Sequence, residues 1–262
     1  MGGIRIAIIA LAMAAIIILA IVLLRRRSAA NAESRPLVLV AGRLIAALYA
    51  CLTLIVTAVA VVATLTAEQV EATIPVREFW PEPYPWITIL EGPSAQVTGG
   101  GFSSAEVFIT GLGMDARAFL AAGHAVQGAS FIVIAVTIAL LCQRLLSGSG
   151  FTAAVTRAVS MSGLTVMIGG IAWQIFFAVG GNIASTQALF VSAWGSDDAP
   201  GPDVPEPKWD GTAYDPLHTG LPDPDFMLQL DFWPLLLGLA LAAVAFAFRR
   251  AERLQDDTKG LV

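Results

Sequence analysis

Five apolar runs, each close to the length of a membrane span, alternate with polar and charged stretches along the chain. They cover residues 4–24, 37–66, 119–146, 155–183 and 232–248. A helix rises ~1.5 Å per residue, so about 20 apolar residues cross the ~30 Å hydrocarbon core of a bilayer. The pattern therefore predicts an all-α transmembrane bundle of five spans.

The last run is the shortest, and its flanking residues help to define it. We expect Asp231 to be the N-cap of this helix, with Pro234 in its first turn, where a missing N–H is harmless. Arg249 and Arg250 follow the run and mark the far interface. Residues 232–248 are therefore expected to form a complete span.

The first run allows two interpretations, a retained anchor or a cleaved signal peptide. A signal peptide carries basic residues before its apolar core, whereas Arg25, Arg26 and Arg27 follow the core here. This order favours a retained anchor. The sequence thus predicts an N-terminal membrane anchor helix with a basic cytoplasmic turn at residues 1–34, and a four-span membrane domain at residues 35–262.

Two connections, residues 67–118 and 184–230, are long enough to fold or to carry a function of their own. Segments of β-rich composition, bounded by glycine and proline, predict strands at residues 86–90, 96–98, 105–110 and 188–194. We expect these strands to form a small β-containing extracellular cap. Residues 196–225 are dense in Asp, Pro and Gly, which predicts an extended segment.

Composition narrows the class of protein. Apolar residues make up 56% of the chain and charged residues 13%, with a mean hydropathy of +0.75. A soluble domain carries about a quarter charged residues, so this low charge content excludes a soluble globular domain. The two cysteines are too few for a disulfide-rich miniprotein. A multi-pass membrane protein is the class that remains.

The distribution of charge predicts the orientation. Most of the 15 Lys and Arg residues lie between runs one and two, between runs three and four, and after run five, whereas most of the 20 Asp and Glu residues lie in the two long connections. The positive-inside rule places the basic side in the cytoplasm. The N-terminus is then outside, the connections 67–118 and 184–230 are extracellular, and the tail 249–262 is cytoplasmic. The preference for arginine over lysine, with abundant Ala, Gly and Val, is typical of a GC-rich bacterial genome and indicates a bacterial plasma membrane.

Candidate chemistry is sparse in the connections and at the span ends. His124 and Asp115 could form a proton-sensitive pair, although a histidine at the interface or bonded within the fold is favoured, and with His218 the chain has too few histidines for a zinc site. Cys51 and Cys142 lie at different depths, which favours packing roles over a disulfide. Acidic residues of the second connection could bind a cation, but their spacing matches no calcium loop and a solvated exterior is favoured. These residues are Asp197, Asp198, Asp203, Glu206, Asp210, Asp215, Asp223 and Asp225.

The interiors of the runs carry no charged residue near their middle, whereas proton-coupled transporters and intramembrane hydrolases need buried charge. The most unusual features are Trp173 and Gln174, which follow Gly169 and Gly170 in the fourth run. Close packing of helices at the glycines explains them more simply than a substrate site. The sequence also lacks the common phosphate, zinc and nucleophile motifs. We therefore expect no catalytic, cofactor-binding or metal site.

The C-terminal region resembles a known family. It reads LDFWPLLLGL over residues 230–239 and FRRAERLQDD over residues 248–257. This pattern resembles the bacterial integral membrane family known as domain of unknown function twenty-nine seventy-five, and the turn Gly150-Phe151-Thr152 is similar to a turn of that family. Phe246 stands where a glutamate is common in the family.

The resemblance covers about residues 37–262 and leaves the first run as an addition. It implies a four-span domain with no established enzymatic activity. Relatives of this kind are often encoded beside a small helix-turn-helix regulator, which implies a regulatory role.

Together these observations predict a non-enzymatic, multi-pass plasma-membrane protein with a sensing, regulatory or partner-binding role. The expected partners are the lipid bilayer and either another membrane protein or a small cytoplasmic helix-turn-helix regulator. No basic region is large enough for direct nucleic-acid binding. A transporter, or an accessory subunit of a membrane complex, is the alternative. A membrane enzyme is a third class and would need a polar cavity lined by titratable groups.

Overall fold

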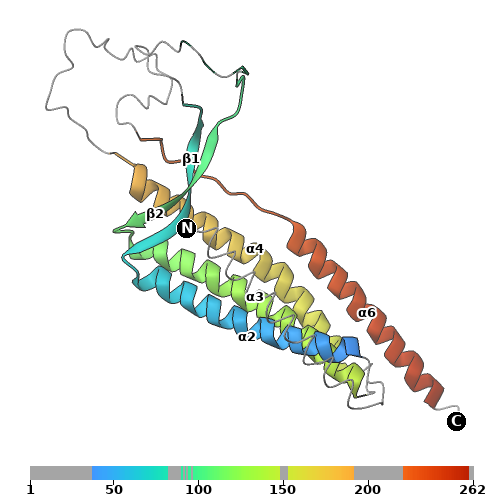
Figure 1. Cartoon of the computed structure of the whole chain (residues 1–262). Helices are drawn as coiled ribbons and strands as arrows, with labels where there is room; N and C mark the ends of the chain where they lie inside the picture. The colour runs from blue at the N-terminus through green and yellow to red at the C-terminus, as the bar shows by residue number, and fades with distance from the viewer. Residues whose placement is uncertain are drawn as a thin grey trace, which may run out of the picture. The chain divides into compact units, whose positions relative to one another are not determined.

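A computed structural model describes residues 37–81, 90, 92, 94–95, 97–147, 153–191 and 221–259. Within them lie helices α2 (Leu37–Thr66), α3 (Met114–Leu146), α4 (Ala153–Leu189) and α6 (Trp233–Lys259), and strands β1 (Gln69–Phe79) and β2 (Phe102–Thr110) (Figure 1). All four of these helices are long and apolar enough to cross a membrane. The last four predicted runs are thus confirmed as long apolar helices, and the anchor predicted at residues 1–34 lies outside the described part of the chain.

The described residues form two compact units. Residues 37–61, 122–174 and 230–259 make up the first, called the helical unit below. Residues 62–121, 175–191 and 221–229 make up the second, called the hairpin unit. Helices α2, α3 and α4 each contribute residues to both units.

The helical unit exposes large apolar side chains along its helices. In water such a surface would be unusually large for a folded domain, whereas hydrocarbon is its natural solvent. The exposed side chains include Leu44, Leu54 and Val59 of α2, Met161, Leu164 and Ile168 of α4, and Leu236, Leu239 and Phe246 of α6. This surface is typical of helices that face lipid.

Small residues bring α4 and α6 close together in the helical unit. A Cβ atom at Gly163 would lie 2.9 Å from the carbonyl oxygen of Gly238, and one at Gly238 would lie 2.7 Å from the carbonyl oxygen of Gly163. A Cβ at Gly170 would overlap Pro234, whose side chain is fully buried. The predicted packing role of Gly170 is therefore confirmed, because only glycine permits this approach.

The predicted N-cap of α6 is wrong. The helix begins at Trp233, and the N–H groups of Leu235 and Leu236 donate to the carbonyl of Phe232 at 3.1 and 3.4 Å, so Phe232 occupies the cap. Asp231 instead pairs with the side-chain amide of Gln174. Its N–H donates to Gln174 Oε1 at 2.6 Å, and its carbonyl accepts from Gln174 Nε2 at 3.0 Å. The unusual Gln174 thus binds the chain that leads into α6.

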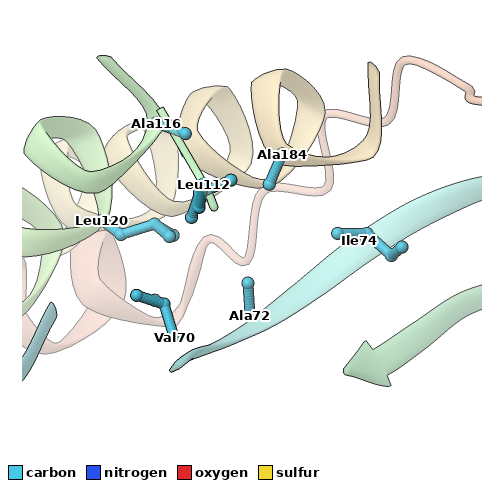
Figure 2. Packing of buried hydrophobic residues seen from close by; sticks show 7 residues of the cluster. All are labelled: Val70, Ala72, Ile74, Leu112, Ala116, Leu120 and Ala184. Carbon is cyan, nitrogen blue, oxygen red and sulfur yellow. The ribbon is translucent and has the colours of Figure 1, made fainter. Parts of the chain in front are cut away.

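The hairpin unit is built around an antiparallel pair, β1–β2, with Gln69 opposite Thr110 and Ile74 opposite Ala105. Alternate residues of β1 point inward and pack on α3 and α4 (Figure 2). The buried cluster contains Val70, Ala72, Ile74, Leu112, Ala116, Leu120 and Ala184. Alternate residues of β1 therefore meet residues spaced four apart, Leu112, Ala116 and Leu120, before and within the first turns of α3.

The predicted strands are only partly confirmed. Residues 105–110 do lie in β2, whereas β1 was not expected. The strand predicted at 188–194 is wrong where the structure describes it, because α4 runs on to Leu189 and residues 190–191 have no regular structure. Residues 97–98 form no strand, and residues 86–89 lie outside the described part.

Arg117 lies at the centre of the hairpin unit and is only 8% exposed. Its guanidinium donates to four backbone carbonyls: Leu112 at 2.9 Å, Thr64 at 3.2 Å, Ala67 at 2.7 Å and Glu68 at 3.5 Å. Thr64 belongs to the last turn of α2, so the cation satisfies carbonyls at the negative end of that helix. A single side chain thus fixes the end of α2, the chain entering β1 and the start of α3.

Two polar side chains of α4 bind the backbone of other segments in the hairpin unit. Ser185 is fully buried and donates to the carbonyl of Pro75 in β1 at 2.5 Å. The amide of Asn182 donates to the carbonyl of Met227 at 3.3 Å and accepts from its N–H at 3.0 Å. Beside β1, Arg77 pairs with Asp223 at 3.6 Å. The segment before α6 therefore belongs to this unit through α4 and β1.

Candidate functional site

A groove of about 350 Å³ lies between α2 and α3 in the helical unit. Its lining comes from both helices and mixes polar with apolar side chains. The α2 residues are Tyr49, Leu52, Thr53, Val56, Thr57 and Ala60, and the α3 residues are His124, Gln127, Gly128 and Phe131. Ligand pockets in proteins occupy roughly 300–1,000 Å³, so this groove suits a small ligand.

Helical spacing explains how each wall is formed. Tyr49, Thr53 and Thr57 recur every four residues, which places them on one face of α2. On α3, His124 and Gln127 are three residues apart and share a face in the same way. The groove thus lies between two short polar stripes on helices that are largely apolar.

Gly128 sets the distance between the two walls. A Cβ atom there would overlap the side chain of Thr57, so the helices approach more closely at this point than any other residue at position 128 would allow. Thr57 and Gly128 therefore form a narrow part of the groove.

The polar lining of the groove has spare hydrogen-bonding capacity. The side chains of Tyr49, Thr53, Thr57 and Gln127 make no hydrogen bond to any residue that the structure describes. A polar group that loses water without gaining a partner costs roughly 1–3 kcal/mol, and at membrane depth such groups mark functional sites. The lining can therefore donate to and accept from a bound molecule.

An aromatic series supports one wall. Phe131 lines the groove and packs against Trp173 of α4, with ring centroids 5.3 Å apart. Trp173 packs in turn on Trp233 at the start of α6, with centroids 6.0 Å apart. The three rings connect the groove wall to α4 and α6 within the helical unit.

The structure does not bring together the pair His124 and Asp115. The two residues are nine positions apart on α3, roughly 13 Å of helical rise. The carboxylate of Asp115 instead accepts from Nε2 of Gln187 at 2.9 Å, while Oε1 of Gln187 accepts from the N–H of Gly113 at 2.8 Å. Gln187 therefore caps the start of α3.

The other predicted candidates fall outside the groove. Cys51 is exposed and Cys142 half-buried, and both are free thiols. Of the eight acidic residues of the second connection, only Asp223 and Asp225 are described, and Asp223 pairs with Arg77. Across the described ranges, no three His, Cys, Asp or Glu side chains are placed to bind a metal ion.

Sequence reasoning missed the groove residues, except that His124 was weighed as a candidate. The signal was present as a four-residue repeat of Tyr49, Thr53 and Thr57 within an apolar run. No family model, curated protein or solved structure matches this chain. The chemistry of the site therefore rests on the residues of the groove.

Proposed function

We propose that the chain is a non-enzymatic, multi-pass protein of a bacterial plasma membrane that binds a small lipid-soluble molecule in the groove between α2 and α3. Binding would regulate a partner protein. The observation that carries this proposal is the polar lining of Tyr49, Thr53, Thr57, His124 and Gln127 within two helices whose surroundings are apolar. In hydrocarbon the side chains of Tyr49, Thr53, Thr57 and Gln127, which bond to no described residue, need a partner, and a ligand from the bilayer supplies one.

A sensing role accounts for the groove better than transport does. The charged side chains of α2 and α3 lie close to the helix ends, at Arg43, Asp115, Arg117 and Arg144. A transporter of ions or charged solutes needs ionisable groups along its path. A transporter of neutral molecules, or an accessory subunit of a membrane complex, is the second candidate.

The proposed partner is another membrane protein or a small cytoplasmic helix-turn-helix regulator. Helix α6 continues beyond Arg249 and Arg250 to Lys259, so the segment predicted as a tail at residues 249–262 is helical as far as Lys259. A helical tail can present a defined face to a partner. Affinity purification should recover the partner with the full chain and lose it with a chain that ends at residue 248; equal recovery would remove the tail from the proposal.

The proposed topology has five spans, an external N-terminus and a cytoplasmic C-terminus. In a variant without Cys51 and Cys142, a cysteine replacing Ser104 of β2 should react with an impermeant maleimide in intact cells. A cysteine replacing Ser147, just after α3, should react only after permeabilisation. Ser104 and Ser147 are both exposed in the structure, so a difference in labelling between them reports the side of the membrane on which each lies. The reverse labelling pattern would contradict the orientation.

Binding in the groove can be tested by native mass spectrometry of the full chain released from lipid nanodiscs. We expect one small molecule per chain, with occupancy reduced about tenfold by Thr53→Val or Gln127→Leu, because each change removes hydrogen bonds worth about 1 kcal/mol or more.

Matched controls use the same substitutions away from the groove. Thr66 ends α2 and, among the described residues, its hydroxyl bonds only to the carbonyl of Val62 at 2.8 Å. Gln143 is exposed near the end of α3. Thr66→Val and Gln143→Leu should leave occupancy unchanged. A wild-type chain without a bound molecule, or equal occupancy in all variants, would refute the proposed function.

A further inference from the structure

The lining of the groove excludes a charged ligand. No Asp, Glu, Lys or Arg contributes to it, and its polar groups are two threonine hydroxyls, a phenol, an amide and an imidazole. An ionised phosphate or carboxylate would lose its hydration at this depth without meeting an opposite charge. The ligand of such a site is neutral.

Both walls of the groove carry polar groups. Tyr49, Thr53 and Thr57 supply α2 with hydroxyls about one helical turn, ~5.4 Å, apart. His124 and Gln127 supply α3 with an imidazole and an amide. A ligand that bonds to both walls needs oxygen atoms on opposite edges of its head group.

These polar groups can each donate or accept. A hydroxyl, an amide and a neutral imidazole donate to a carbonyl oxygen and equally accept from a hydroxyl. The site therefore suits a head group that exists both as a carbonyl compound and as its hydroxyl form. An ether oxygen can only accept hydrogen bonds, so it would leave the acceptor atoms of the lining without a donor.

The apolar part of the lining suits a flat ring with an apolar tail. Phe131 and Tyr49 present aromatic surfaces, on which flat rings stack. Val56 lines the groove and is 39% exposed, so the rim reaches the lipid-facing surface of α2. A tail can leave the groove at this rim and lie among lipid chains.

Building on the proposed function, we propose that the groove binds the head group of a para-quinone and of its quinol. One ring oxygen bonds to the hydroxyl of Thr53 on α2, and the opposite one to the amide of Gln127 on α3. The ring lies beside Phe131, and the tail leaves past Val56.

The test is a titration of the full chain in nanodiscs with a decyl-substituted para-benzoquinone and, in a separate arm, with its quinol. Quinones quench indole fluorescence, and Trp173 packs against the groove-lining Phe131 at 5.3 Å. We expect saturable quenching of the indole fluorescence, and direct binding of radiolabelled quinone that saturates over the same concentration range. Thr53→Val and Gln127→Leu should weaken binding about tenfold each, and Thr66→Val and Gln143→Leu should leave it unchanged.

The controls separate this inference from the proposed function. Decanol has a matching tail and a single hydroxyl but no ring, and it should bind at least about tenfold more weakly if both walls engage the ligand. Equal binding of decanol, or no saturable quinone binding, would overturn the quinone assignment. If native mass spectrometry then still finds another molecule that Gln127→Leu releases, the proposed function stands without the quinone. If it finds none, both fail.

Discussion

Replacing Arg117 with methionine is expected to unfold the hairpin unit and to lower the stability of the chain by roughly 2–4 kcal/mol. The guanidinium binds the carbonyls of Leu112, Thr64, Ala67 and Glu68 in a buried position. Methionine fills similar space but donates no hydrogen bond, so these carbonyls lose the hydrogen bonds that the guanidinium donates to them. The apparent melting temperature in detergent should fall by about 6–12 °C for a loss of ~3 kcal/mol.

Arg77→Met is the matched control for this change. Arg77 forms an ion pair with Asp223 at 3.6 Å, and both side chains are nearly half exposed. Exposed ion pairs contribute about 0–1 kcal/mol, so the melting temperature should move by only a few degrees. The melting temperature of Arg117→Lys should lie between those of Arg117→Met and Arg77→Met. The lysine ammonium keeps the positive charge but lacks the planar guanidinium that donates to several carbonyls at once. Equal effects of Arg117→Met and Arg77→Met would contradict the assigned role.

Gly170→Ala is expected to separate α6 from α4, with a loss of about 2 kcal/mol or more. The new methyl group would overlap the buried ring of Pro234, which cannot rotate away. Alanine has a higher helix propensity than glycine, by roughly 1 kcal/mol, and this gain offsets part of the loss. The measured destabilisation is therefore smaller than the cost of the overlap itself. Thermal unfolding in detergent measures the net change, and proteolysis within α6 reports its release.

Gly42→Ala in α2 provides the comparison. Its Cβ would lie 3.2 Å from Sγ of Cys142, a contact that a small shift of that side chain relieves. The same gain in helix propensity then remains nearly uncompensated, so this variant should be as stable as the wild type or slightly more stable. A Gly170→Ala variant that behaves like Gly42→Ala would show that the helices do not require this close contact.

The helices of the chain could be predicted well from the sequence because lipid-facing helices are long continuous apolar runs. The run at residues 37–66 matches α2. The start of α3 was placed five residues late, at Phe119 instead of Met114, because its first turn contains Asp115 and Arg117. Contacts with Gln187 and with the end of α2 hold that turn in place. The hydrophobic pattern along the chain does not report such contacts between residues that are distant in sequence.

The strands and the groove also depend on contacts between residues that are distant in sequence, so they could be predicted only in part. β1 contains a clear alternation of Val70, Ala72 and Ile74, yet Pro75 follows, and proline is disfavoured within strands. The structure tolerates this proline, whose carbonyl accepts from Ser185. The polar stripe of α2 could be read from the sequence, but the face of α3 that it meets depends on how the two helices pack. The α2 wall of the candidate site could therefore be predicted from the sequence, whereas its pairing with α3 could not.

The hydrogen bond between Ser185 and Pro75 has a consequence for how the chain is made. Its two ends are 110 residues apart in the sequence. A ribosome adds ~5–20 residues per second, so the partner of β1 on α4 follows roughly 5–20 s after the strand itself. During that interval the apolar face of β1 lacks Ala184, one of the residues that finally cover it. Biogenesis of this protein thus includes a waiting period, in which β1 must be kept from wrong pairings until α4 has been made.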